Sequence, residues 1–182
     1  MWAPAITIDA PAAEPLELAA VKEFLRIDAD DTTFDTELIG YIAGVRDDAE
    51  AISGTRLITQ TVELRADSFA DLLRLPIGPV QSVTGFTYLD AAGVEQTLVA
   101  GADFELFGAV LQQGLRPVFG ATWPAGAMRA SSIVIDAVVG YGPTGADLPQ
   151  SLYIALLRAV RGLRDDKPIS LEHLLNNHRI WL

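Results

Sequence analysis

The sequence of 182 residues contains no cysteine and only two histidines, His173 and His178. Without cysteine the chain forms no disulfide, and it offers neither a thiolate metal ligand nor a cysteine nucleophile. The two histidines stand five positions apart, whereas side chains that share one face of a helix to bind zinc stand three or four apart. The sequence therefore predicts no metal site, no cofactor and no cysteine-based catalysis.

Long apolar segments are also missing. The longest apolar run, Ile133 to Val139, is interrupted by Asp136, and it is far shorter than the roughly 20 residues that a membrane-spanning helix needs. The opening residues Met1 to Pro4 have neither a basic segment nor an apolar stretch behind it, so we expect no secretory signal. These absences predict that no membrane is among the partners of this chain.

Basic residues are scarce, with 13 Lys and Arg against 24 Asp and Glu, for a net charge of −11. The imbalance is local: residues 14–50 hold eleven acids and three bases, whereas residues 151–182 hold three acids and five bases. A surface that grips DNA needs Lys and Arg to displace the counterions of the phosphates. The acidic segment therefore predicts either an ordinary solvated face of a helical pair or a wall that DNA passes without binding.

Catalytic signatures are likewise absent, since no phosphate-binding loop, dinucleotide fingerprint or Gly-x-Ser-x-Gly elbow occurs. Asp28, Asp30 and Asp31 resemble part of a calcium loop but lack its glycine and distal glutamate, which favours helix-capping acids instead. Some hydrolases assemble a site from scattered residues, and here Asp103, Glu105 and Arg116 around a cleft are the candidates. This enzyme alternative remains open at the level of sequence.

Helical periodicity appears in three stretches. Residues 14–26 predict a first helix, with Glu14 and Glu17 in its first turn, where the helix dipole favours acids. A longer second helix is predicted to follow a cap at Thr32 and Asp35 and to end at Gly54. A last long helix is predicted from a first turn at Pro149 to about residue 165. The apolar positions that indicate the second helix are Phe34, Leu38, Ile42, Val45, Ala49 and Ile52.

The middle of the chain has the signals of β structure. Pro76, Gly78 and Pro79 break the helical pattern, after which residues 82–89 and 94–99 predict two strands joined by a turn at 90–93. Alternation over residues 58–64 and the β-branched run at 132–140 predict two further strands, and residues 101–126 allow short ones. The order of elements predicts an α+β fold with a small helical bundle and an inserted antiparallel β portion.

Three groups of residues follow one another along the chain. The first is Glu14-Pro15-Leu16-Glu17-Leu18 with Phe24-Leu25-Arg26-Ile27-Asp28; the second is Leu75-Pro76 with Pro79-Val80 and Tyr88-Leu89-Asp90; the third is Val139-Gly140-Tyr141-Gly142 before Leu148-Pro149. Taken in this order, they resemble the tailed-phage head-tail connector (adaptor) family, which includes the adaptor of gene transfer agents. The resemblance covers about residues 14–164.

The resemblance implies one connector domain over residues 1–182. Its parts would be N-terminal helices at 14–54, a β-rich insertion at 57–142, a long helix at 148–165 and a docking segment at 170–182. It implies a structural subunit without enzymatic activity that forms a ring, in keeping with a dodecameric portal. The ring would lie under the portal at the head-tail junction of a virion or phage-like particle assembled in the bacterial cytoplasm.

The same resemblance implies the partners, which are the portal protein, a tail-side stopper or tail-completion protein and further copies of the chain. DNA would pass through the ring without specific binding. Within the acidic segment, Asp47, Asp48 and Glu50 are the candidates to line this channel. A non-catalytic binding module of a cellular complex remains an alternative, since it would share the absence of motifs.

The C-terminal segment carries an apolar load that a free tail would not keep exposed. Two interpretations stay open: the segment docks into the portal, as the family's C-terminal parts do, or it folds back on its own helical bundle. Under the docking interpretation, deleting residues 170–182 would leave a folded chain. The candidate portal-docking residues are Leu171, Leu174, Leu175, Ile180, Trp181 and Leu182.

Overall fold

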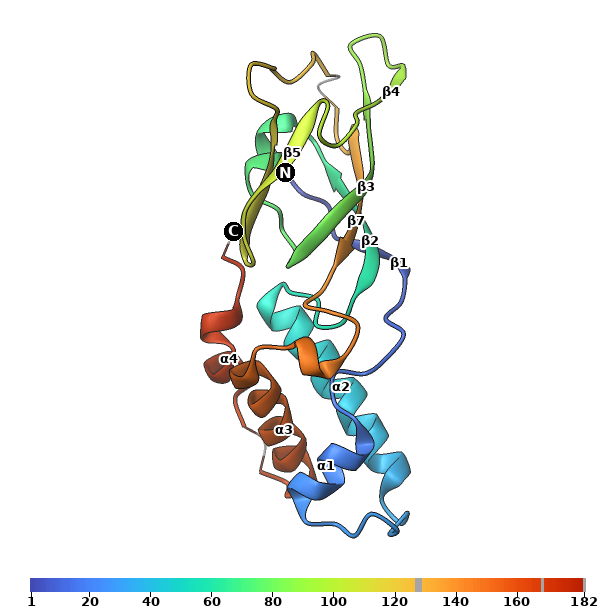
Figure 1. The fold of residues 1–182 in the computed structure, drawn as a ribbon, viewed down its shortest axis with the longest axis vertical. Helices are drawn as coiled ribbons and strands as arrows, with labels where there is room; N and C mark the ends of the chain where they lie inside the picture. The colour runs from blue at the N-terminus through green and yellow to red at the C-terminus, as the bar shows by residue number, and fades with distance from the viewer. Residues whose placement is uncertain (127–128, 168, 182) are drawn as a thin grey trace. The chain divides into compact units, whose positions relative to one another are not determined.

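The computed structural model describes residues 1–126, 129–167 and 169–181 and divides into two compact units. The β unit consists of residues 1–10, 60–140 and the chain end from Ile180, and the helical unit consists of residues 11–59 and 141–179 (Figure 1). The antiparallel β portion is thus inserted into the helical unit, which confirms the predicted α+β class. Each unit has a hydrophobic core of its own. The expectation that residues 1–182 form one connector domain stays a prediction.

Four helices pack together in the helical unit. They are α1 (Leu18–Leu25), α2 (Asp35–Ser53), α3 (Gln150–Arg164) and α4 (Leu171–Leu174), with short 3-10 turns η2 (Gly145–Asp147) and η3 (Asn176–His178). The predicted apolar stripe of α2 is buried in this core at four positions, Leu38, Ile42, Val45 and Ala49. Gly54 ends α2 as predicted: it has a φ of 71°, and its N–H donates to Glu50 O.

The predicted starts of α1 and α2 need correction. The first helix begins at Leu18, because Glu17 is extended at the N-cap and Pro15 precedes it. Glu14 therefore lies outside the helix, where its carboxylate pairs with Arg46 on α2. The residue at the N-cap of α2 is Phe34, and no side chain caps this helix. The predicted cap at Thr32 and Asp35 is wrong, since Asp35 makes an ion pair instead.

That ion pair joins α1 to the start of α2. Lys22 is buried, and its Nζ lies 2.5 Å from Asp35 Oδ1 and 3.2 Å from the carbonyl oxygen of Ala29, to which it donates. A buried ammonium group is costly unless it has such partners. The two contacts therefore fix the loop between the helices as well as the helices themselves.

A five-stranded antiparallel sheet organises the β unit, in the order β1-β2-β7-β3-β4. Its strands are β1 (Ile6–Asp9), β2 (Gln60–Ala66), β7 (Ile133–Val139), β3 (Val80–Leu89) and β4 (Glu95–Thr97). The turn predicted at 90–93 is confirmed, because Asp90 Oδ1 accepts hydrogen bonds from the N–H groups of Ala92 and Val94. The predicted strands over 58–64, 82–89, 94–99 and 132–140 match β2, β3, β4 and β7, and no end differs by more than two residues.

One face of the sheet is covered by a second layer. This layer contains the hairpin of β5 (Phe104–Ala109) and β6 (Gln112–Pro117) and the 3-10 helix η1 (Phe69–Leu73). Leu72, Phe104 and Leu115 of this layer are buried against the strands. Between the layers, the ring of Phe69 stacks on Trp123 with centroids 4.9 Å apart, and Phe86 meets Phe104 edge to face at 5.0 Å.

We predict that Lys22→Ala lowers the free energy of unfolding by about 2 kcal/mol, because it leaves the Asp35 carboxylate without its counterion in a partly buried position. Thermal or urea denaturation measures this loss. Glu23→Ala is the matched control, since Glu23 is exposed on the same helix, and its effect should stay within about 0.5 kcal/mol. Equal effects of the two substitutions would contradict the role given to Lys22.

Candidate interaction surfaces

The three residues considered for a hydrolase site form separate structural contacts. Glu105 and Arg116 face each other across the β5-β6 hairpin, where Arg116 Nε lies 2.7 Å from Glu105 Oε1. Asp103 Oδ2 accepts a hydrogen bond of 2.7 Å from the N–H of Val99 in a turn. These contacts account for all three side chains, so the enzyme alternative gains no support from them.

The acidic turn before α2 has a local structural explanation. Asp31 Oδ1 accepts a hydrogen bond from the N–H of Thr33, and hydrogen bonding by Thr33 holds the pKa of Asp31 below its ordinary value. Within residues 1–126, 129–167 and 169–181, no group of three or more His, Asp or Glu side chains could hold a metal ion. No helix in the same residues is long and apolar enough to cross a membrane.

The channel candidates on α2 differ in their surroundings. The side chain of Asp47 is 70% exposed and pairs with Arg46, with Arg46 Nη2 2.9 Å from Asp47 Oδ1. Asp48 is exposed as well. Both carboxylates thus stand on the solvent side of the helix, opposite the buried stripe that includes Val45 and Ala49, and either can face another molecule.

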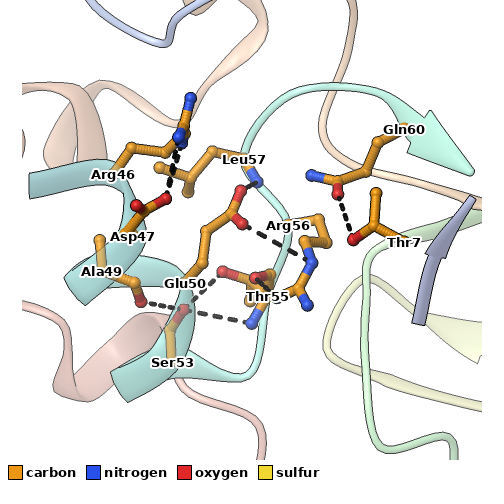
Figure 2. Close-up of polar contacts among 10 residues, drawn as sticks. All are labelled: Thr7, Arg46, Asp47, Ala49, Glu50, Ser53, Thr55, Arg56, Leu57 and Gln60. Carbon is orange, nitrogen blue, oxygen red and sulfur yellow. Dashed lines mark hydrogen bonds and ion pairs between the residues drawn. The ribbon is translucent and has the colours of Figure 1, made fainter. Parts of the chain in front are cut away.

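Glu50 is turned into the chain instead. Its side chain is only 12% exposed, Oε1 accepts a hydrogen bond of 2.9 Å from the N–H of Leu57, and Oε2 lies 3.6 Å from Arg56 Nε (Figure 2). Burial raises the pKa of Glu50, and the hydrogen bond from Leu57 and the charge of Arg56 oppose this rise. Glu50 therefore braces the turn that follows α2, and its expected place on a channel wall is corrected.

Neighbouring hydroxyl groups complete this brace. Ser53 Oγ lies 2.6 Å from the carbonyl oxygen of Ala49, to which it donates, and 2.6 Å from Thr55 Oγ1 (Figure 2). Ser53 Oγ also accepts a hydrogen bond from the N–H of Thr55. The end of α2 is thus tied to residues 55–57 by side chains whose hydrogen bonds are made within the unit.

The predicted portal-docking residues fall into three groups. Leu175 is fully buried in the core of the helical unit, and Leu171 and Leu174 are half-buried against that core. Ile180 is buried in the β unit, close to Gly78. Trp181 is 56% exposed, and Leu182 lies outside the described residues.

The burial of Leu175 and Ile180 corrects the docking expectation for these two residues, because side chains enclosed by their own chain present no surface to a partner. The burial of Leu175 supports the alternative in which the segment folds back on its own helical bundle, whereas Ile180 lies in the β unit. Deletion of residues 170–182 would remove these buried side chains, so we now expect the deletion to destabilise the chain. Docking through Trp181 remains a prediction.

The chain resembles three solved structures of gene transfer agent (GTA) particles. One is described as the neck of an empty GTA particle computed with C6 symmetry, with 22% identity, 99% of this chain and 97% of that chain covered, and a TM-score of 0.79. Another is the virion of a native GTA particle, with 24% identity, coverage of 98% and 96%, and a TM-score of 0.76.

The third is the neck of a native GTA particle computed with C12 symmetry, with 22% identity, coverage of 97% and 96%, and a TM-score of 0.64. No protein-family profile matches the sequence, and no curated protein matches it. At this level of identity the likenesses show the fold. They agree with the resemblance seen in the sequence, and they extend it from residues 14–164 to nearly the whole chain.

We predict that Glu50→Ala lowers the free energy of unfolding by about 1–2 kcal/mol, because it leaves the N–H of Leu57 without an acceptor. Glu50→Gln is the matched control: its amide oxygen can still accept that hydrogen bond, and its effect should stay within about 0.5 kcal/mol. Denaturation at neutral pH measures both. A negligible effect of Glu50→Ala would contradict the bracing role.

The free energy of unfolding of the wild type and that of Glu50→Gln should depend differently on pH. Because the pKa of Glu50 is higher in the folded chain than in the unfolded chain, the folded state binds more protons between the two values. The contribution of Glu50 to stability is therefore greatest below the unfolded pKa and falls as the pH rises through the raised folded pKa. Glu50→Gln has no carboxyl group at this position. Its stability relative to the wild type should therefore increase as the pH rises from the unfolded pKa of Glu50 through its raised folded pKa.

Proposed function

We propose that this chain is a head-tail connector (adaptor) subunit of a phage-like particle, of the kind found in gene transfer agents. The observation that carries the proposal is the fold match to chains of GTA particles over 97–99% of this chain and 96–97% of theirs. A match this complete in both directions leaves little of either chain outside the shared fold. A binding module of an unrelated cellular complex would not be expected to share the whole order of elements.

The proposed assembly is a ring under the portal that joins the capsid to the tail and extends the DNA channel. Two of the similar structures are necks computed with C6 and C12 symmetry, which supports a ring, and twelve copies are the proposed number. The proposed partners are the portal protein above and a stopper or tail-completion protein below. The proposed role is structural, without covalent chemistry.

Passage of DNA fits the charge of the chain. An acidic wall repels phosphate and has no Lys or Arg with which to hold it. Asp47 and Asp48 are exposed on α2 and are the candidates for such a wall. Asp47 is partly neutralised by Arg46, so Asp48 is the stronger candidate of the two.

Docking to the portal is proposed to involve Trp181. This indole is more than half exposed although Ile180 beside it is buried. Tryptophan is the residue type most enriched among the anchors of protein interfaces. An anchor of this kind, repeated in every subunit of a ring, would hold the ring to the portal by many equal contacts.

We predict that Asp47→Lys with Asp48→Lys slows DNA delivery by assembled particles, because the introduced ammonium groups bind phosphates as DNA passes. Assembly should be unchanged. Asp47→Asn with Asp48→Asn is the matched control, which removes the negative charge without adding phosphate ligands, and it should deliver DNA at nearly the normal rate. Transfer of a marker gene to recipient cells measures delivery, and normal transfer by the Lys variant would exclude these residues from the channel wall.

We predict that Trp181→Ala weakens binding to the portal about thirtyfold, which corresponds to the loss of ~2 kcal/mol typical of an interface anchor. Its thermal melt should match that of the wild type, since the side chain is largely exposed. Phe119→Ala is the control, because Phe119 is a fully exposed aromatic residue elsewhere on the chain. Binding of purified portal to immobilised chain measures the effect, and equal affinities of the two variants would contradict docking through Trp181.

A further inference from the structure

The sheet of the β unit has one face that no helix or strand among the described residues of this unit covers. The hairpin of β5 and β6 and the helix η1 lie against the opposite face (Figure 1). The open face, here called the outer face, is formed by the half-exposed positions of β2 and β7 and by their neighbours in the ladder. It includes Ile6, Glu63, Val134, Asp136 and Val138.

The outer face carries aliphatic side chains among polar ones. β7 presents two half-exposed valines, Val134 and Val138, on its outer side, whereas the outward residues of β2 are Thr61, Glu63 and Arg65. Ile6, at the register of Glu63 on the edge strand β1, is more than half exposed. Interfaces between subunits commonly combine aliphatic and charged side chains in this way.

Asp136 stands at the centre of the outer face without a partner for its carboxylate among the described residues. The residue opposite it on β2 is Glu63, another acid, whose own carboxylate is paired with Arg65 at 2.6 Å. Burial raises the pKa of Asp136, and the charge of Glu63 adds to the rise. Two like charges placed opposite each other destabilise a sheet, so Asp136 costs stability in the isolated chain.

The Asp136 carboxylate leans over the neighbouring strand. The residue opposite Asp136 on β3 is Gly85, and an added Cβ at Gly85 would lie 2.8 Å from Asp136 Oδ2. The glycine therefore makes room for this carboxylate. Asp136 is half-buried on the outer face, so a donor from another molecule that approaches this face can reach its oxygen atoms.

The opposite side of the same β unit carries a matching pair of residues at the end of η1. Leu72 is buried against the sheet, whereas the next residue, Leu73, is 61% exposed. Arg74 follows it and is exposed, and its guanidinium has no hydrogen bond or ion pair within residues 1–126, 129–167 and 169–181. Its backbone is held in place, because the carbonyl oxygen of Arg74 accepts a hydrogen bond of 3.0 Å from Trp2 Nε1.

We propose that the outer face of one copy of this chain binds Leu73 and Arg74 of a second copy, with the Arg74 guanidinium on the Asp136 carboxylate and Leu73 against the apolar side chains around it. The inference rests on the proposed ring. The inference specifies which residues neighbouring subunits use to contact each other, and a ring alone does not specify these residues.

The positions of the two surfaces favour a second copy as the partner. A ring is built from head-to-tail contacts, in which one patch of each subunit meets a different patch of the next. The outer face and the Leu73-Arg74 pair lie on opposite sides of one rigid two-layer unit, as such a contact requires. Their charges are opposite, and each brings both an unpaired ionised group and an exposed aliphatic side chain.

Chemical cross-linking tests the contact directly, because the chain has no cysteine of its own. Ala70→Cys and Thr87→Cys place one thiol on each surface and leave Leu73, Arg74 and Asp136 intact. Ala70 is exposed on η1, one 3-10 turn before Leu73, and Thr87 stands opposite Val134 on the outer side of β3. Rings assembled on purified portal and treated with a short bis-maleimide should give a ladder of covalent multimers. The matched control, Ala70→Cys with Glu105→Cys, has both thiols on the layer formed by η1 and the β5-β6 hairpin and should give no ladder.

Charge exchange provides the second measurement. Arg74→Glu and Asp136→Lys should each lower the number of rings on portal about tenfold, and the two together should restore it to within about threefold. Asp136→Asn should melt at the same temperature as the wild type or higher, while its rings decrease, since it removes the repulsion from Glu63 along with the ion pair. Equal assembly by all these variants would overturn the contact.

The outcomes separate this contact from the proposed function. If the wild-type chain forms rings on portal but the double-cysteine variant gives no ladder and charge exchange gives no rescue, the contact is wrong and the connector function stands. If the wild-type chain forms no ring on portal, the connector function fails and the contact fails with it. A ladder together with rescue by charge exchange supports both.

Discussion

The pairing of β2 with β7 is the constraint on which the rest of the fold depends. Seven consecutive residue pairs join the two strands, from Gln60 opposite Val139 to Ala66 opposite Ile133. β2 stands at the start and β7 at the end of the central segment of the β unit, residues 60–140, so the pairing closes this segment into one insertion. Without it, α2 and α3 would be separated in sequence by an open loop, whose closure costs conformational entropy.

The same pairing organises the two faces of the β unit. Because side chains alternate along a strand, the residues of β7 that pack inward, such as Ile133 and Ile135, require their neighbours to point outward. Val134, Asp136 and Val138 are outward for that reason. The unit's own core does not require valine at positions 134 and 138, and these two outward side chains belong to the proposed contact between ring subunits.

The fold class and most elements could be predicted from sequence, because they depend on short-range patterns. Helical spacing located α2 and α3, β-branched alternation located β2 and β7, and Asp90 to Gly93 located the turn after β3. The starts of α1 and α2 could not, because Glu14 and Asp35, which looked like helix-start residues, form tertiary ion pairs with Arg46 and Lys22. A local cap signal carries no information about partners distant in sequence or on another helix.

The candidate surfaces were predicted less well, for a related reason. The exposure of an acid or a leucine depends on what the chain places beside it, so Asp47 and Asp48 are exposed, whereas Glu50, two positions further on, braces a turn. Leu175 and Ile180 looked available for docking and are buried. Asp136, the acid inside the apolar run at 133–139, was the one sign of the outer face in the sequence. That its carboxylate has no partner among the described residues could be seen only once the strand register was known.

A cryo-EM reconstruction of the particle that contains this chain tests the connector role directly. We expect density for this fold as a ring of twelve copies between portal and tail, with the outer face of each β unit against the Leu73-Arg74 segment of its neighbour. Density for the chain elsewhere in the particle, or a complete head-tail junction without it, would exclude the connector role.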